Sequence, residues 1–269
     1  MSNEVAKWDE RLAQLAGEYA STEALGGTFF STKGGVLSFN DEALPGNQMV
    51  VVILDVVRER TFYTEKYVAG AENNLPPICY AFARTQEEID TMAPHPSMQA
   101  GPDYFVPQNE TCKGCPNDEW GSSDTGRGKA CGERRRIALL PAGYYLPKKG
   151  SRDFYLELFN GPEHVEHYQT ADIAYLKLPV MSVKDYARYT VHLSSTHSRP
   201  PFAVISRVYL EPDPKSQFRV KFEVLDLVPP ELFETIYARH EEAKSSIIFG
   251  YPPPSAEDVA GRGGRSARR

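Results

Sequence analysis

No apolar run in the 269-residue sequence approaches the roughly 18 residues that a membrane-spanning helix needs. The N-terminal segment MSNEVAKWDERL is charged where a secretory signal would be apolar, so we expect a cytoplasmic protein with no membrane partner. Cysteine is scarce, with four residues in the chain. Because a cytoplasm keeps thiols reduced, closely spaced cysteines there are more often metal ligands than disulfides.

Motifs of catalysis are missing as well. The stretch GRGKACG, residues 126–132, has neither the G-x-x-x-x-G-K-[ST] nor the G-x-G-x-x-G spacing of a phosphate loop, and no G-x-S-x-G nucleophile motif is present. Asp55 interrupts the apolar run VVVILDVV, where we expect it to mark a bulge or a strand end. His164 and Glu166 in EHVEHY would share one face of a strand, which is typical of a solvated edge. The sequence therefore predicts a non-enzymatic protein, and a metal-dependent nuclease is the least favoured alternative.

Positive charge is not in excess, because 30 Lys and Arg face 36 Asp and Glu, for a net charge of −6. This balance argues against a protein that coats duplex DNA with its whole surface, although a nucleic-acid binder needs only a local positive strip. Two such strips are present. Residues 127–136 hold five cations and one acid, and the final GRGGRSARR holds four arginines and no acid.

Alternating apolar patterns predict a domain rich in strands, of α+β class, with a closed or sandwiched sheet and helices at its ends. We expect an N-terminal helix within residues 1–24, a single domain over 25–250 and a disordered Arg/Gly tail over 251–269. The predicted strands cover residues 48–68, 78–84, 134–143, 152–159 and 173–180, and a predicted hairpin covers 202–228. One predicted helix covers 183–194 and begins at a capping box of Ser182 and Asp185. A second covers 231–248 and directs Leu232, Phe233, Ile236 and Tyr237 toward the core.

Three of the four cysteines lie in one glycine-rich stretch. Cys112-x2-Cys115 has the spacing of a local zinc chelate, and Cys131 follows after a loop that can fold back. We expect the fourth ligand to be Cys79, with His95 as the alternative. Four thiolates leave a zinc ion no open position, which predicts a structural site that holds neighbouring cations in place. An iron–sulfur cluster on the same thiolates and four unliganded thiols are the remaining alternatives.

Basic and aromatic side chains alternate on the predicted strands. Single-stranded nucleic acid is bound by such surfaces, because bases stack on aromatic rings while cations contact phosphates. In the hairpin, pairing Leu210 with Phe218 places the basic residues on one face and the apolar residues on the other. Ordinary amphipathic strands, with arginines that only balance nearby acids, are the competing interpretation. The candidate nucleic-acid-binding residues are Arg58, Arg60, Phe62, Tyr63, Arg127, Lys129, Arg134, Arg135, Arg136, Arg207, Tyr209, Arg219 and Lys221.

Several segments, in order, resemble proteins of tailed bacteriophages, most of them hypothetical and some described as single-stranded-DNA-binding. The likeness covers about residues 25–245. It is strongest in CKGCPNDEWGS and GRGKACGERRRIALLP, with FFSTKGGVLSF, PGNQMVVVILDVVRERTFY, NLPPICYAF and LPVMSVKDYARY around them.

This resemblance implies a viral protein of the bacterial cytoplasm that binds single-stranded DNA in replication or recombination. By analogy with zinc-containing phage replication proteins, it implies an OB-like barrel with an inserted zinc knuckle over about residues 79–136, in which Cys112, Cys115 and Cys131 are ligands. Such proteins usually end in an acidic segment that recruits partners, whereas GRGGRSARR is basic and favours direct phosphate contact. The alternative is a zinc-stabilised adaptor for a replication or transcription protein of host or phage, such as a polymerase subunit.

Overall fold

The computed structural model describes residues 29–64, 75–98, 104–151 and 154–254. The helix predicted within residues 1–24 lies outside these ranges, as does the tail predicted over 251–269 except for residues 251–254, where the Tyr251 hydroxyl donates to Oε1 of Glu59. The strands are β1 (Phe29–Phe30), β2 (Ser38–Phe39), β3 (Glu42–Ala43), β4 (Gln48–Phe62), β5 (Cys79–Ala83), β6 (Gly132–Pro147), β7 (Phe154–Leu158), β8 (Ala174–Leu178), β9 (Val204–Asp213) and β10 (Gln217–Leu227). The α-helices of the described residues are α2 (Gln86–Asp90), α3 (Val165–Thr170), α4 (Val183–His192) and α5 (Pro230–Ser246).

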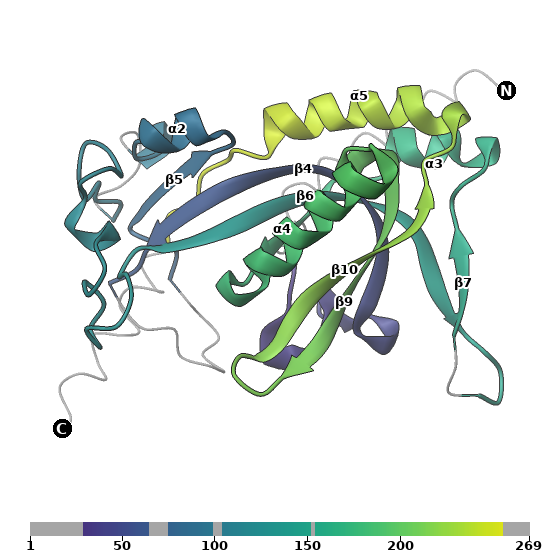
Figure 1. Cartoon of the computed structure of the whole chain (residues 1–269), viewed down its shortest axis with the longest axis horizontal. Coiled ribbons are helices and arrows are strands. Elements are labelled where there is room, and N and C mark those ends of the chain that lie inside the picture. The colour runs from purple at the N-terminus through teal and green to yellow at the C-terminus, as the bar shows by residue number, and fades with distance from the viewer. Residues whose placement is uncertain (1–28, 65–74, 99–103, 152–153, 255–269) are drawn as a thin grey trace, which may run out of the picture.

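Eight of the strands form one mixed sheet in the order β1-β8-β6-β4-β9-β10, with β5 paired to β4 and β7 paired to β6. Strands β1 and β8 run parallel, and the long central strands β4 and β6 are antiparallel (Figure 1). The edge strands β1 and β10 do not pair with each other, so the sheet stays open over the described residues. The chain thus has the predicted α+β class, but this part of it does not close the OB-like barrel that we expected.

Strands β4 and β6 carry bulges that change which residues face each side of the sheet. Opposite β6, the partners on β4 pass from Ile53 directly to Asp55, so Leu54 is an extra residue. An extra residue reverses the alternation of side chains beyond it. Leu54 and Val57 therefore face the same core although they are three residues apart. The bulge confirms the prediction for Asp55, and it turns Arg58 away from that core.

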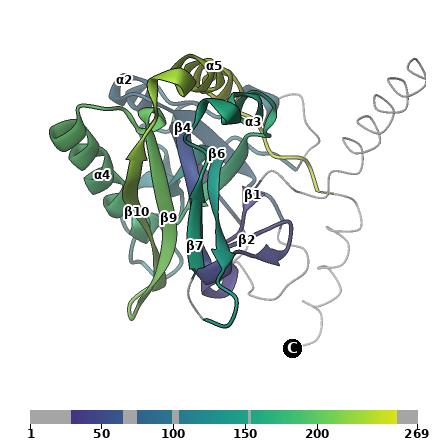
Figure 2. The same cartoon turned by 90° about the vertical axis from the view of Figure 1, so that its right-hand side faces the viewer.

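Each face of the sheet has its own core. On one face, Leu232 and Ile236 of α5 are fully buried against the central strands. On the other face, Tyr186 and Tyr189 of α4 pack on Phe222 of β10, with ring centroids 5.2 and 5.6 Å apart. Figures 1 and 2 show α5 and α4 on different sides of the sheet. The two cores hold β4 from Met49 to Val57 and β6 from Ile137 to Ala142. The C-terminal end of β4 and the N-terminal end of β6, which pair with each other, extend beyond both cores.

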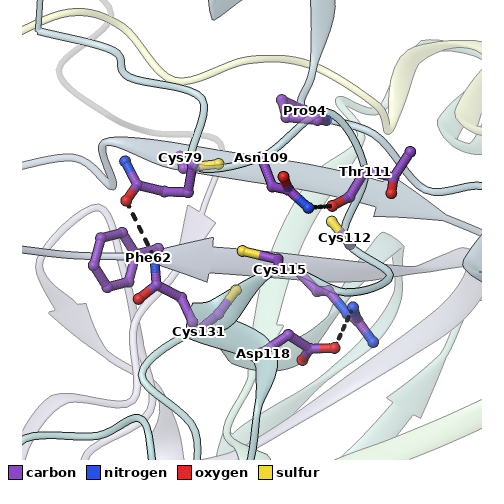
Figure 3. A pocket seen from close by; sticks show the side chains of 12 residues that line it. Phe62, Cys79, Pro94, Asn109, Thr111, Cys112, Cys115, Asp118 and Cys131 are labelled. Carbon is purple, nitrogen blue, oxygen red and sulfur yellow. Dashed lines mark hydrogen bonds and ion pairs between the residues drawn. The ribbon is translucent and has the colours of Figure 1, made fainter.

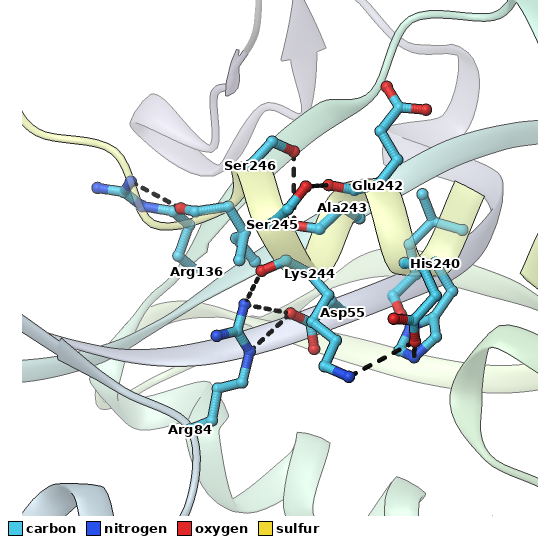
Figure 4. Close-up of polar contacts among 12 residues, drawn as sticks. Asp55, Arg84, Arg136, His240, Glu242, Ala243, Lys244, Ser245 and Ser246 are labelled. Carbon is cyan, nitrogen blue, oxygen red and sulfur yellow. Dashed lines mark hydrogen bonds and ion pairs between the residues drawn. The ribbon is translucent and has the colours of Figure 1, made fainter. Parts of the chain in front are cut away.

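Arg84 joins the bulge of β4 to the end of α5 (Figure 4). Its Nε and Nη2 both lie 3.1 Å from Oδ2 of Asp55, and Nη2 also donates to the carbonyl of Lys244. A cation is favourable there because the last carbonyls of a helix carry partial negative charge. Asp55 is therefore part of a structural ion pair. His164 and Glu166 lie in a 3-10 helix and in α3, so the strand face predicted for them is wrong.

Candidate nucleic-acid interface beside a four-cysteine cavity

All four cysteines line one small cavity, although they come from separate segments of the chain. Cys79 begins β5, Cys112 and Cys115 lie in the loop between α2 and β6, and Cys131 is the residue before β6. All four are free thiols, and Figure 3 shows their sulfur atoms around the same space. The cavity measures about 20 Å³. Since about 10–15 Å³ holds one water molecule, it has room for one small ion.

The structure brings the four predicted cysteines together without placing them in ligand geometry. As they stand, no three His, Cys, Asp or Glu side chains of the described ranges form a set that could hold a metal ion. The alternative ligand, His95, does not line the cavity. Its Nδ1 lies 2.8 Å from Oγ of Ser97, and its ring stacks on Tyr80 with centroids 5.6 Å apart.

Burial governs the chemistry of these thiols. Desolvation raises the pKa of Cys79, raises the pKa of Cys112 to about 11 and raises the pKa of Cys131 to about 12. A thiol that stays protonated at neutral pH is a weak nucleophile.

The loop around the cysteines is fixed by backbone hydrogen bonds. The amide of Cys112 donates to the carbonyl of Met92 at 2.7 Å, and the amide of Cys131 donates to the carbonyl of Asn117 at 2.8 Å. Gly114, between the first two cysteines of the loop, has a φ of 77°, which residues with a side chain adopt only with strain. The chain thus turns back sharply enough for Cys112 and Cys115 to face one cavity.

Four cations share two carboxylates next to this cavity, at the C-terminal end of β4 and the N-terminal end of β6. The distal cation cluster consists of Arg58, Arg60, Lys129 and Arg135 together with Asp118 and Glu133. Asp118 lies 2.9 Å from Arg60 and 2.9 Å from Lys129, while Glu133 lies 2.9 Å from Arg135, 3.5 Å from Arg60 and 3.7 Å from Arg58. Four positive charges against two negative ones leave a surplus of two.

Two of the four cations are open to solvent. The exposed fractions of the side chains are 32% for Arg58 and 42% for Lys129, against 11% for Arg60 and 15% for Arg135. Burial would raise the pKa of the Glu133 carboxyl, but Arg135, Arg60 and Arg58 outweigh it and hold that pKa below its usual value. Glu133 therefore stays ionised and holds the guanidinium groups together, and the positive charge that it does not neutralise faces the solvent.

The β9–β10 hairpin, the second predicted basic surface, has no such surplus. Arg207, Arg219 and Lys221 of the hairpin and Arg188 of α4 pair with Glu211, Asp213 and Glu223 of the hairpin and with Asp185 of α4, at 2.9–3.7 Å. The guanidinium of Arg207 also lies 4.5 Å from the centre of the Tyr209 ring. Four cations against four carboxylates leave this surface neutral.

Arg136 is a predicted contact residue that the structure places in the interior. Its side chain is 1% exposed, and its Nη2 lies 2.5 Å from Oε1 of Glu59, which is fully buried. Its Nη1 donates to the carbonyls of Ile247 and Phe249 at 3.1 and 2.9 Å. All of these partners are structural, so Arg136 holds the segment after α5 against the sheet.

The remaining predicted residues are divided between the two faces of the sheet, with Phe62 on the face of the distal cation cluster and Tyr63 and Arg134 on the face of Glu59. Phe62 lines the cysteine cavity, and Tyr63 is exposed immediately after β4. Arg127 is exposed in the loop before β6, and Arg134 is paired in register with Glu59 of β4.

The interpretation in which the cations balance nearby acids included Asp118, and the structure does pair Asp118 with Lys129 as well as with Arg60. Sequence reasoning did not single out Trp120, whose side chain is 81% exposed in the same loop. The one signal in the sequence is a tryptophan among charged residues and glycines.

Comparisons with protein-family models, with curated proteins and with solved structures found no match to this chain. None of the helices described is long and apolar enough to cross a membrane.

Proposed function

We propose that the protein binds single-stranded DNA, without catalysis, through the distal cation cluster and the aromatic residues beside it. The observation that carries this proposal is the surplus of positive charge where four cations share two carboxylates. A phosphate that approaches Arg58 or Lys129 meets a cation that its carboxylate partner neutralises only in part. Phe62 lines the cysteine cavity together with Arg60 and offers a ring beside the cluster, whereas Tyr63 lies on the opposite face of the sheet, near Glu59 and Tyr251.

The ion pairs favour this surface over the hairpin. On β9 and β10 the predicted cations meet an equal number of carboxylates, whereas in the distal cation cluster four cations share two. Arg136 is left out of the proposed interface because it is buried. The interface therefore comprises the ends of β4 and β6 and the loop between Cys112 and Cys131.

The protein holds this loop, we further propose, with one structural zinc ion on Cys79, Cys112, Cys115 and Cys131. The fit rests on the donor set, because all four cysteines of the chain line a cavity with room for one ion. Thiolates are the preferred ligands of structural zinc, and the thiol side chains would have to turn toward the centre to reach it. Arg60 lines the same cavity, so ordering the cysteines also orders the cation cluster. Zn²⁺ with four thiolates would carry a net charge of −2, which Arg60 faces; Arg58 and Lys129 do not line the cavity and are the cations left for a phosphate.

Salt-dependent binding of a labelled thymidine oligonucleotide, followed by fluorescence anisotropy, tests the proposal. The variant R58Q/K129Q removes two charges from the cluster, and the matched control R207Q/K221Q removes two from the hairpin, so both lower the net charge equally. Each phosphate contact on a single strand contributes about −0.7 to the slope of log K against log salt. We expect the cluster variant to lose about 1.4 of that slope and the hairpin variant to keep it. Absence of binding at low salt, or equal losses in both variants, would contradict the proposal.

Protein binding through α5 is a second candidate function. Phe233 and Tyr237, which the sequence predicts to face the core, are 42% and 49% exposed, and both rings lie near Phe202. Such a row of exposed rings suits a protein surface better than a phosphate strand. A partner that remains bound to the purified protein after nuclease treatment, and is lost from F233S/Y237S, would support this role.

A further inference from the structure

Trp120 is the most exposed large apolar side chain of the described residues, at 81% against 67% for Val191, the next. Tryptophan is highly buried on average, because its indole has a large apolar surface. No aromatic ring or cation of the described ranges packs on this indole closely enough to form a ring or cation–π contact. Both faces of the ring are therefore open to a ligand.

The loop that carries Trp120 is tied by hydrogen bonds on both sides of this residue. The amide of Gly121 donates to the carbonyl of Gly128 at 2.7 Å. Oγ of Ser122 donates to the carbonyl of Glu119 at 2.7 Å and accepts from the amide of Ala130 at 2.9 Å. Because the backbone is held in this way, little entropy is lost when a ligand packs on the indole.

Trp120 stands beside the distal cation cluster. Asp118, two residues earlier, is the carboxylate that binds both Arg60 and Lys129. Between residues 104 and 131, the only other exposed large apolar side chain is Val106. A single ring next to a surplus of cations does not form the contiguous apolar patch that a protein partner needs. It matches one flat apolar group that is joined to a negative charge, which is a nucleotide of a single strand.

We propose that Trp120 stacks on an unpaired base of the bound strand while the distal cation cluster contacts the adjacent phosphates. This inference rests on the proposed function and adds the means by which the protein selects a single strand. Bases in a duplex stack on each other and present only their edges, so the indole has no base face to pack on. Every base has an aromatic face, so the contact is independent of sequence.

The test uses the fluorescence of Trp120 in the full chain. The sequence has two tryptophans, Trp8 and Trp120, so W8F leaves Trp120 as the only indole. A thymidine oligonucleotide should quench the emission of W8F in parallel with the anisotropy change of a labelled oligonucleotide. An abasic oligonucleotide of equal length should bind through its phosphates without the quenching.

Two further variants measure the contribution of the stack. W120L should bind the thymidine oligonucleotide about 5- to 150-fold more weakly and the abasic one equally well, while W120F should recover most of the affinity. Since the side chain is exposed, the circular dichroism and melting temperature of W120L should match those of the unmodified protein. If the oligonucleotide binds W8F without quenching, and W120L binds as tightly as the unmodified protein, the stacking role is wrong and the cation cluster stands. If no oligonucleotide binds W8F at low salt, both proposals fail.

Discussion

The buried pair of Arg136 and Glu59 allows a stability prediction that can be worked from the structure. Both side chains are essentially inaccessible, at 1% and 0% exposure, and their nearest atoms lie 2.5 Å apart. The guanidinium also lies 4.2 Å from the centre of the Phe249 ring and 4.4 Å from that of Phe82. In R136M the methionine packs against the same rings, and the Glu59 carboxylate keeps the hydrogen bond from the Tyr251 hydroxyl but loses the guanidinium that neutralises it.

Removing one partner of a buried ion pair costs about 3–5 kcal/mol of unfolding free energy, because the other charge stays buried without compensation. For a chain of this size each kcal/mol corresponds to about 2–4 °C, so R136M should melt about 6–20 °C lower. Replacing both residues, in R136M/E59L, removes the unpaired charge and should recover at least half of the loss. Urea denaturation followed by circular dichroism measures R136M, E59L and R136M/E59L. The reasoning is refuted if R136M changes the unfolding free energy by less than about 0.5 kcal/mol, or if the two single effects simply add.

Two other predictions concern titratable groups. Burial lowers the pKa of Lys177 to about 8, so the folded protein binds fewer protons than the unfolded chain between pH 8 and about 10.4 and is stabilised as pH rises through that range. K177M should therefore be more stable than the unmodified protein at pH 7, and this advantage should shrink toward pH 10 in urea titrations; an advantage that does not depend on pH would contradict it. Purified protein should contain one zinc ion per chain by elemental analysis, and the variants C112S and C131S should lose it. Removal of the ion with a chelator should lower the melting temperature. A metal-free or brown protein would contradict the zinc site.

The strands were predictable from the sequence because their signal is local. The long apolar run before Asp55, the short run that begins at Cys79 and the hairpin at 204–227 are all strands in the structure. The hairpin register was wrong by two residues, since Leu210 pairs with Val220 and not with Phe218. A shift of two keeps each side chain on its predicted face, so the alternation that we expected survives.

Tertiary contacts decided the features that the sequence misjudged. Ser182 and Asp185 have the spacing of a capping box, and α4 does begin after Ser182, but no side-chain hydrogen bond caps its N-terminus. Oγ of Ser182 accepts from the amide of Val220, and Asp185 binds Lys221 at 2.9 Å. Both residues are used to hold α4 against β10. The same holds for the charge of the hairpin, because its carboxylate partners come partly from a helix distant in sequence.

The sequence was sufficient to predict which cysteines line the candidate site, but not which of its arginines are exposed and which are buried. Spacing identifies Cys112 and Cys115, and elimination adds Cys131 and Cys79, because the chain has no other cysteine. Which arginines remain available depends on the partner that each one meets across the sheet, and no pattern in the sequence states this. Arg135 and Arg136 are adjacent in sequence, yet one belongs to the exposed cluster and the other to the core.

Arg60 connects the two halves of the site, and this connection gives the cavity a role in binding. Its guanidinium lies 2.9 Å from Asp118 and lines the cavity with the four cysteines; burial lowers its pKa, but the negative charges of Asp118, Glu133 and the neighbouring cysteines together raise it. An ion that fixes the cysteines also fixes the loop from Cys112 to Cys131, and hence Asp118, Lys129 and Trp120. Loss of the cysteines should therefore weaken binding of a single strand although no cysteine touches it. The size of that loss of affinity measures how much the binding depends on an ordered loop and how much on positive charge alone.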